Sequence, residues 1–200
     1  MEAGAVGDDG SAWLVIGLGN HGPAHAGQRH NVGFLVVDRL AERMGAPFRL
    51  HKSRLAEVVE GRLAVPGPRV VLGRPRCYMN ESGGPVIALT SFYGIDPGHV
   101  VAVHDELDID FGALRVKLGG GDNGHNGLRS VRAALGTGEF YRVRVGIGRP
   151  SGRRGVSDFV LSGYSTAEKK ELPLQVTDAA DAVQSLITDG LGHTQQRFNR

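Results

Sequence analysis

Apolar residues mark the strands of this chain in two patterns, continuous runs and strict alternation with polar residues. Residues 13–18 (WLVIGL) and 99–104 (HVVAVH) are nearly continuous apolar runs, typical of strands buried on both faces. Residues 141–147 alternate, with basic side chains on one face. The patterns together predict six strands, over residues 13–18, 55–59, 69–72, 99–104, 114–118 and 141–147.

Helical spacing of apolar residues appears between these strands. In the first such segment apolar residues recur at positions 32, 36, 40 and 44, and Gly45 follows as a stop signal. Pro173 predicts a break inside the last segment. We expect helices over residues 31–44, 81–93, 126–135 and 165–191.

The alternation of strands and helices predicts an α/β fold: a single globular domain with a twisted, mixed and largely parallel β-sheet flanked by helices. No internal repeat or linker divides residues 12–200, and residues 1–11 are expected to be a flexible tail without a signal-peptide pattern. No apolar run is long enough for a membrane span. The single cysteine, Cys77, excludes a disulfide framework and fits a reducing compartment, so we expect a cytoplasmic protein.

Charge and glycine are unevenly distributed, and their location changes the picture. The formal net charge is only +2, yet residues 115–154 hold nine Lys or Arg and two Asp or Glu. Arginine supplies most of these cations, and its planar fork suits phosphate. Charge alone leaves a polyanion-binding face and an ordinary solvated face as open alternatives. The 31 glycines, about twice the usual share, cluster in two loops that follow predicted strands.

The first glycine loop, Gly17-Leu18-Gly19-Asn20-His21-Gly22, matches the dinucleotide fingerprint. That fingerprint requires a helix to begin among the glycines, whereas the helical pattern here begins near Asn31. We therefore favour a ligand loop at the carboxyl edge of the sheet over a nicotinamide site. This loop also carries His25, Gln28, Arg29 and His30.

The second glycine loop, residues 119–127, lies between a strand and a helix and lacks the Gly-Lys-Ser/Thr of a P-loop. A binding loop is favoured over a tight connection, because the run includes two asparagines and His125. The segment after the buried strand at 99–104 offers Asp105, Asp108 and Asp110. These carboxylates could bind a metal, form an exposed turn, or include one that orients a catalytic histidine.

The polar residues near the predicted sheet edge suit general-base activation of water. His30 is supported by its loop, whereas His21, His51, His99 and His193 lack such company. There is no G-x-S-x-G elbow, and Cys77 has no adjacent base. Asn80 could cap a helix or direct its amide into the crevice.

Seven blocks resemble the bacterial peptidyl-tRNA hydrolase family. They occur in the family's order, and the resemblance extends from about residue 13 to residue 198. They are Gly17-Leu18-Gly19-Asn20, Gln28-Arg29-His30-Asn31, Tyr78-Met79-Asn80-Glu81-Ser82-Gly83, His104-Asp105-Glu106-Leu107-Asp108, Lys117-Leu118-Gly119-Gly120-Gly121, Gly124-His125-Asn126-Gly127-Leu128 and Arg142-Val143-Arg144-Val145-Gly146-Ile147-Gly148-Arg149-Pro150.

The resemblance implies an enzyme that hydrolyses the ester between a peptide and the 3′-terminal ribose of tRNA, a cytoplasmic monomer with no metal and no organic cofactor. It implies that His30 is the base that activates water, that Asp105 holds its imidazole, and that Asn20 completes the catalytic group. The residues implied in binding peptide or tRNA are His25, Tyr78, Asn80, Asn126, Arg115, Lys117, Arg144 and Arg153.

Three positions depart from the family pattern: His21 for proline, His25 for tyrosine and Asn123 for glycine. His25 would place a second titratable group near His30, and Asn123 tolerates a positive φ better than most residues. One alternative function, an RNA-binding protein of this fold without hydrolysis, would lose the base, whereas His30 and Asp105 are both present.

Overall fold

The computed structural model describes residues 10–153 and 155–199. Residues 1–9 of the expected tail therefore lie outside the described residues. Seven strands form one sheet in the order β2-β3-β4-β1-β5-β7-β6. The four central strands β4, β1, β5 and β7 run parallel, and β2, β3 and β6 add antiparallel pairings at the edges. The strands are β1 (Trp13–Gly17), β2 (Arg49–Leu50), β3 (Ala56–Gly61), β4 (Val70–Pro75), β5 (Val100–Glu106), β6 (Leu114–Leu118) and β7 (Tyr141–Gly146).

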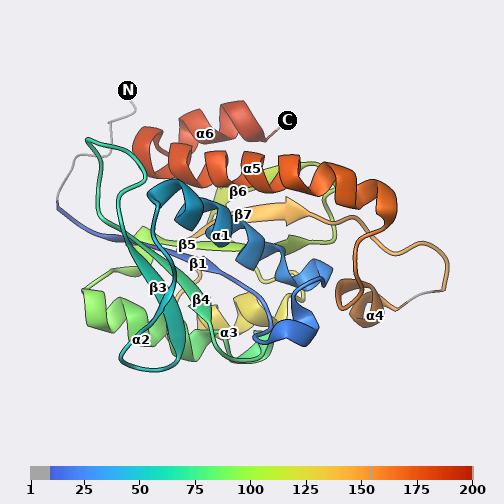
Figure 1. The fold of residues 1–200 in the computed structure, drawn as a ribbon, viewed down its shortest axis with the longest axis horizontal. Helices are drawn as coiled ribbons and strands as arrows, with labels where there is room; N and C mark the ends of the chain where they lie inside the picture. The colour runs from blue at the N-terminus through green and yellow to red at the C-terminus, as the bar shows by residue number, and fades with distance from the viewer. Residues whose placement is uncertain (1–9, 154, 200) are drawn as a thin grey trace.

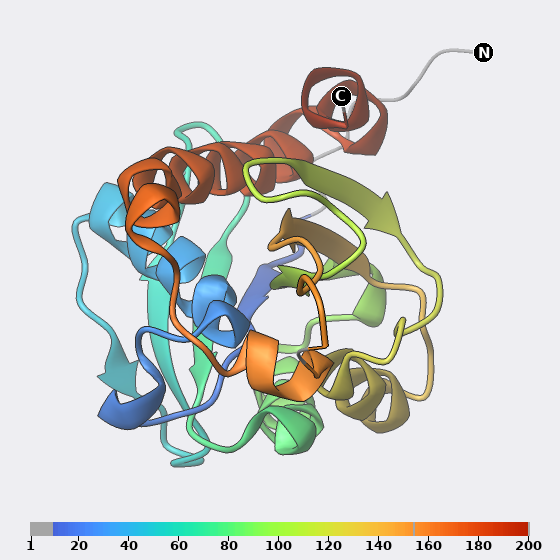
Figure 2. The same cartoon turned by 90° about the vertical axis from the view of Figure 1, so that its right-hand side faces the viewer.

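Helices cover both faces of this sheet, which confirms the expected mixed α/β architecture (Figure 1). Helices α1, α5 and α6 lie on one side, and α2 and α3 on the other, as the perpendicular view also shows (Figure 2). No helix among the described residues has the length and apolarity needed to cross a bilayer. The helices are α1 (Val32–Met44), α2 (Gly83–Tyr93), α3 (Asn126–Leu135), α4 (Val156–Val160), α5 (Thr166–Asp189) and α6 (Leu191–Phe198).

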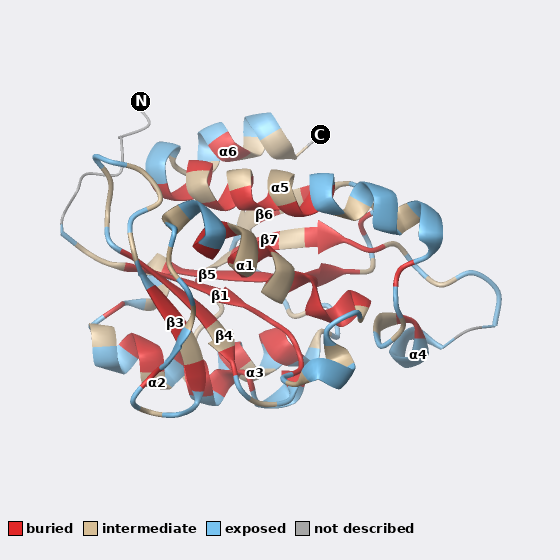
Figure 3. Ribbon diagram, in the orientation of Figure 1, coloured by how far each residue is buried: buried red, intermediate tan, exposed pale blue. Residues whose placement is uncertain are grey.

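The central strands are apolar on both faces because each face has its own core. In β1, Trp13 and Val15 pack into the core beneath α1 and α5, whereas Leu14 and Ile16 pack into the core beneath α2 and α3. Figure 3 shows β1 and β5 buried along their length, between helices with exposed outer faces. Period-two packing on two cores accounts for the continuous apolar run in the sequence.

The predicted break at Pro173 is wrong. Helix α5 continues through Pro173 and ends at Gly190, which has a φ of 84° and separates α5 from α6. A proline removes one backbone hydrogen bond, but the residues beyond it, including Val176, Ala179 and Val183, are buried in the core. Packing of this face outweighs the local preference. The sequence patterns also missed three short elements, β2, α4 and α6.

Two glycines let α1 approach the carboxyl ends of the central strands. A Cβ on Gly33, in the first turn of α1, would overlap the carbonyl oxygen of Val103 and the backbone of Leu18. A Cβ on Gly17, at the end of β1, would overlap the carbonyl of Gly33. The start of α1 therefore sits directly on the strand ends, and the turn that precedes it is brought to the same edge.

Replacing Gly33 with alanine tests this close contact. Although alanine favours helix by its intrinsic propensity, we expect Gly33→Ala to lower the free energy of unfolding by about 1–3 kcal/mol through overpacking. Urea unfolding measures the effect. The matched control is Gly84→Ala in α2, where a Cβ meets nothing within 4 Å, and we expect it to keep or slightly raise stability. Equal stability of the Gly33 variant and the wild type would refute the argument.

Candidate active site

A cavity of about 680 Å³ opens at the carboxyl edge of the parallel strands. Open α/β sheets place ligands at this edge. The loops after β1, β4 and β5, the second glycine loop and α4 contribute its walls. Its lining residues are Asn20, His30, Tyr78, Met79, Asn80, Asp105, Glu106, Leu107, Asn123, Gly124, His125, Asn126, Arg149, Val156, Ser157, Val160 and Leu161.

His30 and Asp105 form a buried pair inside this cavity. Asp105 lies near the end of β5, and His30 lies in the 3₁₀ turn Arg29–Asn31 that leads into α1. Nδ1 of His30 is 2.8 Å and 2.9 Å from the two carboxylate oxygens of Asp105. With the imidazole neutral, Nδ1–H donates to the carboxylate and Nε2 remains as a proton acceptor. The geometry is that of a base held in one tautomer by a carboxylate.

A second imidazole, that of His125, shares this carboxylate, a contact that the sequence patterns did not predict. Nε2 of His125 lies 2.9 Å from Oδ1 of Asp105, while its Nδ1 accepts the N–H of Leu128 at the start of α3. With its ring neutral, these two bonds select the Nε2–H tautomer of His125. Its ring centroid is 5.0 Å from that of His30.

The charge of Asp105 depends on these two neighbours. Burial alone would raise the pKa of Asp105, but the imidazoles of His125 and His30 outweigh burial and hold that pKa well below its usual range. Beneath them, His104 donates from Nδ1 to the Asp105 carbonyl at 2.7 Å. Burial holds the pKa of His104 well below its usual range, so this ring stays neutral.

The Asn20 side chain joins two loops at the rim of the cavity. Its Oδ1 accepts the N–H of Met79 at 2.7 Å, which leaves the Nδ2 group as a donor. The Asn20 backbone is fixed from the other side, because Asn31 bonds both its N–H and its carbonyl at 2.9 Å. Asn31 therefore positions Asn20 in the site, a role that its place in the Gln28–Asn31 motif did not reveal.

Arg29, next to His30, anchors the turn that carries His30. It is buried, and its guanidinium makes two bonds to Glu168 of α5, at 2.6 Å and 2.7 Å. The same group lies over the rings of Phe159 and Tyr164. The Arg29 N–H also donates to the carbonyl of Ser162. These contacts tie the turn that carries His30 to the segment around α4.

The segment around α4 forms the outer wall of the cavity. Val156, Val160 and Leu161 line the cavity together with Tyr78, which is 63% exposed. The sequence patterns did not reveal this five-residue helix, since it is too short to show a period. The role of its apolar side chains, to line the cavity, is visible only in the structure.

The structure brings most of the predicted binding residues to the cavity. Tyr78, Asn80 and Asn126 all line it. Asn80 is not a helix cap, because α2 begins at Gly83 with Ser82 in the N-cap position. His25 is not among the lining residues; it bonds Gln28 at 3.1 Å and packs edge-on against Tyr78. The titratable neighbour of His30 is thus His125, a residue that was predicted only as part of the glycine loop.

The predicted cationic residues gather beside a second cavity, of about 390 Å³, between β6, β7 and the C-terminal residues. Arg115, Lys117 and Arg144 line it. Arg144 is partly neutralised by Glu106, at 3.0 Å. Arg153 is exposed in the loop before α4, outside both cavities. Arg154 lies outside the described residues.

The three aspartates considered as metal ligands do not converge. Asp108 pairs with Arg149, and Asp110 lines the second cavity, away from the buried Asp105. Among the described residues, the cluster with metal-ligand spacing is instead His30, Asp105 and His125, whose ligand atoms lie within 4.8 Å of one another. Nδ1 of His30 and Nε2 of His125 already take part in hydrogen bonds to the Asp105 carboxylate.

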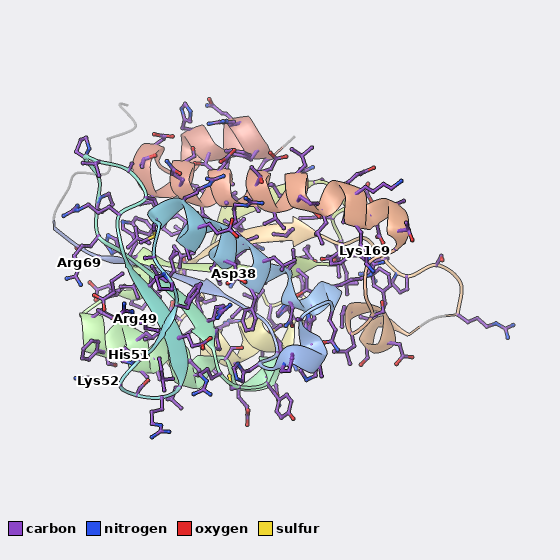
Figure 4. All side chains as sticks on the ribbon, in the orientation of Figure 1. Asp38, Arg49, His51, Lys52, Arg69 and Lys169 are labelled. Carbon is purple, nitrogen blue, oxygen red and sulfur yellow. The ribbon has the colours of Figure 1, made fainter. Side chains whose placement is uncertain are left out.

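The nicotinamide alternative fails on the helix position. The 3₁₀ turn Pro23–His25 follows the first glycine loop, and α1 begins only at Val32. The fingerprint also requires an acidic residue about 20 positions after its glycines. Asp38 has that spacing, but it lies within α1 and bonds Arg74. Figure 4 labels Asp38 near the centre of the view and His51 at the lower left, where His51 bonds Ser53 in the turn after β2.

The fold and cavity define a class: a single-domain α/β protein with a histidine–carboxylate pair in a pocket at the carboxyl edge of its sheet. The sequence model of the family described as Peptidyl-tRNA hydrolase matches residues 14–200. The chain belongs to the peptidyl-tRNA hydrolase family, and it is a hydrolase of ester bonds, as the motif resemblance predicted.

Similar proteins agree along almost the whole chain. Peptidyl-tRNA hydrolases of Frankia alni and Streptomyces coelicolor are 59% and 57% identical, each over 96% of this chain and 95% and 97% of their own. The crystal structure of peptidyl-tRNA hydrolase from Acinetobacter baumannii superposes with a TM-score of 0.86 at 33% identity, covering 94% of each chain.

The Arg29–Glu168 pair generates a pH-dependent prediction. The hydrogen bond from Arg29 is the main cause that lowers the pKa of Glu168 to about 2, from an ordinary 4.5. A lowered folded pKa stabilises the fold above pH 4.5, and that contribution disappears as the pH falls toward 2. We expect Glu168→Gln to lose about 1.5–3 kcal/mol at neutral pH, with the difference from wild type shrinking through this acid range.

Urea unfolding at several pH values measures this difference. The control is Asp181→Asn, which breaks a more exposed pair on α5, the one between Asp181 and Arg43 of α1. We expect that variant to lose less than about 1 kcal/mol. A Glu168→Gln deficit that stays constant down to pH 3 would contradict the assignment.

Proposed function

We propose that the chain cleaves the ester that joins a peptide to the 3′-terminal ribose of tRNA, with His30 as general base and Asp105 as the group that orients it. The observation that carries the proposal is the buried His30–Asp105 pair at the wall of the cavity. Family membership supplies the substrate class, and the geometry supplies the roles.

In the first step, Nε2 of His30 takes a proton from water, and the resulting hydroxide attacks the ester carbonyl carbon. The imidazolium that forms is stabilised by the carboxylate of Asp105, which keeps its charge because His125 and His30 hold its pKa low. Asp105 itself takes up no proton. His125 helps to hold the carboxylate in place through its own bond to Oδ1.

The amide groups at the rim supply donors for the ester. Met79 N–H occupies Oδ1 of Asn20, so Nδ2 of Asn20 is the atom that can donate to the ester carbonyl oxygen as negative charge develops there. Asn80 and Asn126 lie on other walls and can bind the peptide backbone. The tetrahedral intermediate then collapses, and the ribose oxygen leaves with the proton returned by His30.

The cationic residues Arg115, Lys117 and Arg144 are proposed to bind tRNA phosphates. In the antiparallel pairing of β6 with β7, Arg115 lies opposite Arg144, and Lys117 lies opposite Arg142. Like charges at directly opposite positions destabilise a sheet. Arg142 is buried, so the cations of these pairs that line the second cavity are Arg115, Arg144 and Lys117, and their proximity favours a surface that meets an anion. Arg153 is proposed as a more distant phosphate contact on the exposed loop.

We further propose that the protein acts as a monomer in the cytoplasm, where peptidyl-tRNA is released during translation. The substrate is a polyanion that approaches from one side. The cavity and the cationic surface are built from a single chain, so neither needs a second copy.

Replacing His30 with alanine tests the proposed base. We expect the turnover of peptidyl-tRNA to fall by ~10² to 10⁴, the range of a general base, with little change in substrate binding. A single-turnover assay measures the hydrolysis step directly. The control, His193→Ala, removes an exposed imidazole of α6 and should leave the rate unchanged. Residual activity above a tenth of wild type would exclude His30 as the base.

Replacing Lys117 with glutamine tests the phosphate surface. Burial and the neighbouring cations Arg144 and Arg142 lower the pKa of Lys117, which shows how crowded with positive charge this surface is. We expect KM to rise and its dependence on salt to flatten by about 0.7–0.9 in logarithmic slope, the value for one lost phosphate contact. Arg39→Gln on α1, which removes an equal charge, should change neither. An unchanged slope in the Lys117 variant would refute the contact.

A further inference from the structure

Arg142 is one of the nine cationic residues in the segment 115–154, but its charge is not on the surface. The residue is only 1% exposed, the largest of the fully buried side chains. Among the described residues it makes no salt bridge. Its guanidinium centre lies 4.7 Å from the ring centroid of Phe140, and its Nε is buried without a partner. A buried guanidinium of this kind requires other acceptors.

The second glycine loop supplies these acceptors. The guanidinium donates to three successive carbonyl oxygens, those of Gly119 at 2.7 Å, Gly120 at 2.8 Å and Gly121 at 2.8 Å. The positive φ angles of Gly119 and Gly120, 69° and 101°, permit this arrangement. One side chain therefore sets the conformation of the loop.

The orientation of the carbonyl groups fixes that of the N–H groups. In a trans peptide the C=O and the following N–H point in opposite directions. Since the three carbonyls turn inward to Arg142, the N–H groups of Gly120, Gly121 and Asp122 turn outward. Those of Gly120 and Gly121 have no partner among the described residues, and both residues are exposed. Successive outward N–H groups form a concavity that suits an anion.

The charges around this loop favour an anion as well. The ammonium of Lys117 lies against Gly120, because a Cβ there would be 2.8 Å from Nζ. Two carboxylates are also near. Glu139 lies beside Gly119, and Asp122 is occupied by the N–H of Gly124 at 2.9 Å and by Arg129 at 3.6 Å. Neither carboxylate contacts Arg142.

The loop also lies between the two parts of the proposed substrate site. It begins after Lys117 on β6, beside the cationic surface, and it ends at Asn123, Gly124, His125 and Asn126, which line the cavity. A single-stranded 3′ end with its ester in the cavity and its upstream phosphates at Lys117 passes along this loop.

We propose that residues 119–122 form a phosphate-binding site for the single-stranded 3′ end of the substrate, in which backbone N–H groups donate to a phosphodiester oxygen and Arg142 positions the loop. This proposal rests on the proposed function. It adds a phosphate contact between the ester cavity and the cationic surface, made by main chain and therefore independent of base identity.

Gly121 offers a direct test of the loop. A Cβ at this position meets nothing within 4 Å, and its φ lies outside the left-handed region, so a side chain fits without strain. Gly121→Asp places a negative charge where the phosphate would bind, and Gly121→Asn is its neutral isostere. We expect the Asp variant to raise KM for peptidyl-tRNA at least tenfold with kcat within twofold, and the Asn variant to stay within threefold of wild type.

Two controls isolate the site. Gly98→Asp adds the same charge at an equally open position beyond the opposite edge of the sheet, before β5, and should leave KM unchanged. A substrate without phosphate, an N-acylaminoacyl ester of adenosine, should be hydrolysed equally by the Asp and Asn variants. In a Lys117→Gln background, Gly121→Asp should still raise KM, which separates the loop from the lysine.

Equal KM values for the Asp and Asn variants on peptidyl-tRNA would overturn the proposal. So would an equal loss on the phosphate-free ester, or no further effect in the Lys117→Gln background. If the wild-type protein released no peptide from peptidyl-tRNA, the proposed function itself would fail, an outcome distinct from these.

Discussion

A buried carboxylate, that of Asp105, imposes the constraint on which the rest of the site depends. An ionised carboxylate that is 3% exposed must be paired or hydrogen-bonded, since an isolated buried charge is very unfavourable. Here two imidazoles provide the bonds, and they come from different loops, before α1 and before α3. Three segments far apart in sequence must therefore meet at one point for the charge to be tolerated. The geometry of the proposed site is in this sense a condition of folding as well as of chemistry.

The excess of glycine follows from the same convergence. Gly17 and Gly33 let α1 rest on the strand ends, and a Cβ on Gly127 would overlap the sulfur of Met79 on the opposite wall. Close approach of backbones brings the turn of His30 and the loop of His125 to within bonding distance of one carboxylate. Other glycines serve a second purpose, the positive φ angles of Gly119 and Gly120 over Arg142. Composition showed an excess, and the structure divides it between close packing and loop conformation.

Local patterns predicted the fold well where one element is governed by one rule. The two-sided burial of β1 and the period of α1 are both visible in sequence, and their boundaries agree with the structure to within a residue. Pro173 misled because tertiary packing outweighed a local preference. Asp105 could be singled out by its place near a strand end. Its second partner, His125, could not, because that contact depends on how a glycine loop folds across the sheet edge.

The arginines show most clearly why counting charges is not the same as locating them. Residues 115–154 carry a formal excess of positive charge, but several of these arginines already have partners. Arg144 bonds Glu106, and Arg149 bonds Asp108. The guanidinium of Arg142 donates to carbonyl oxygens of the second glycine loop. The charge offered to a polyanion is thus smaller than the sequence suggests and is concentrated near Lys117. Arg142 contributes differently. By drawing three carbonyl dipoles inward, a buried cation directs three N–H dipoles outward, so its positive character reaches the surface through the backbone. A side chain that never touches the solvent can in this way shape the electrostatics of a binding surface.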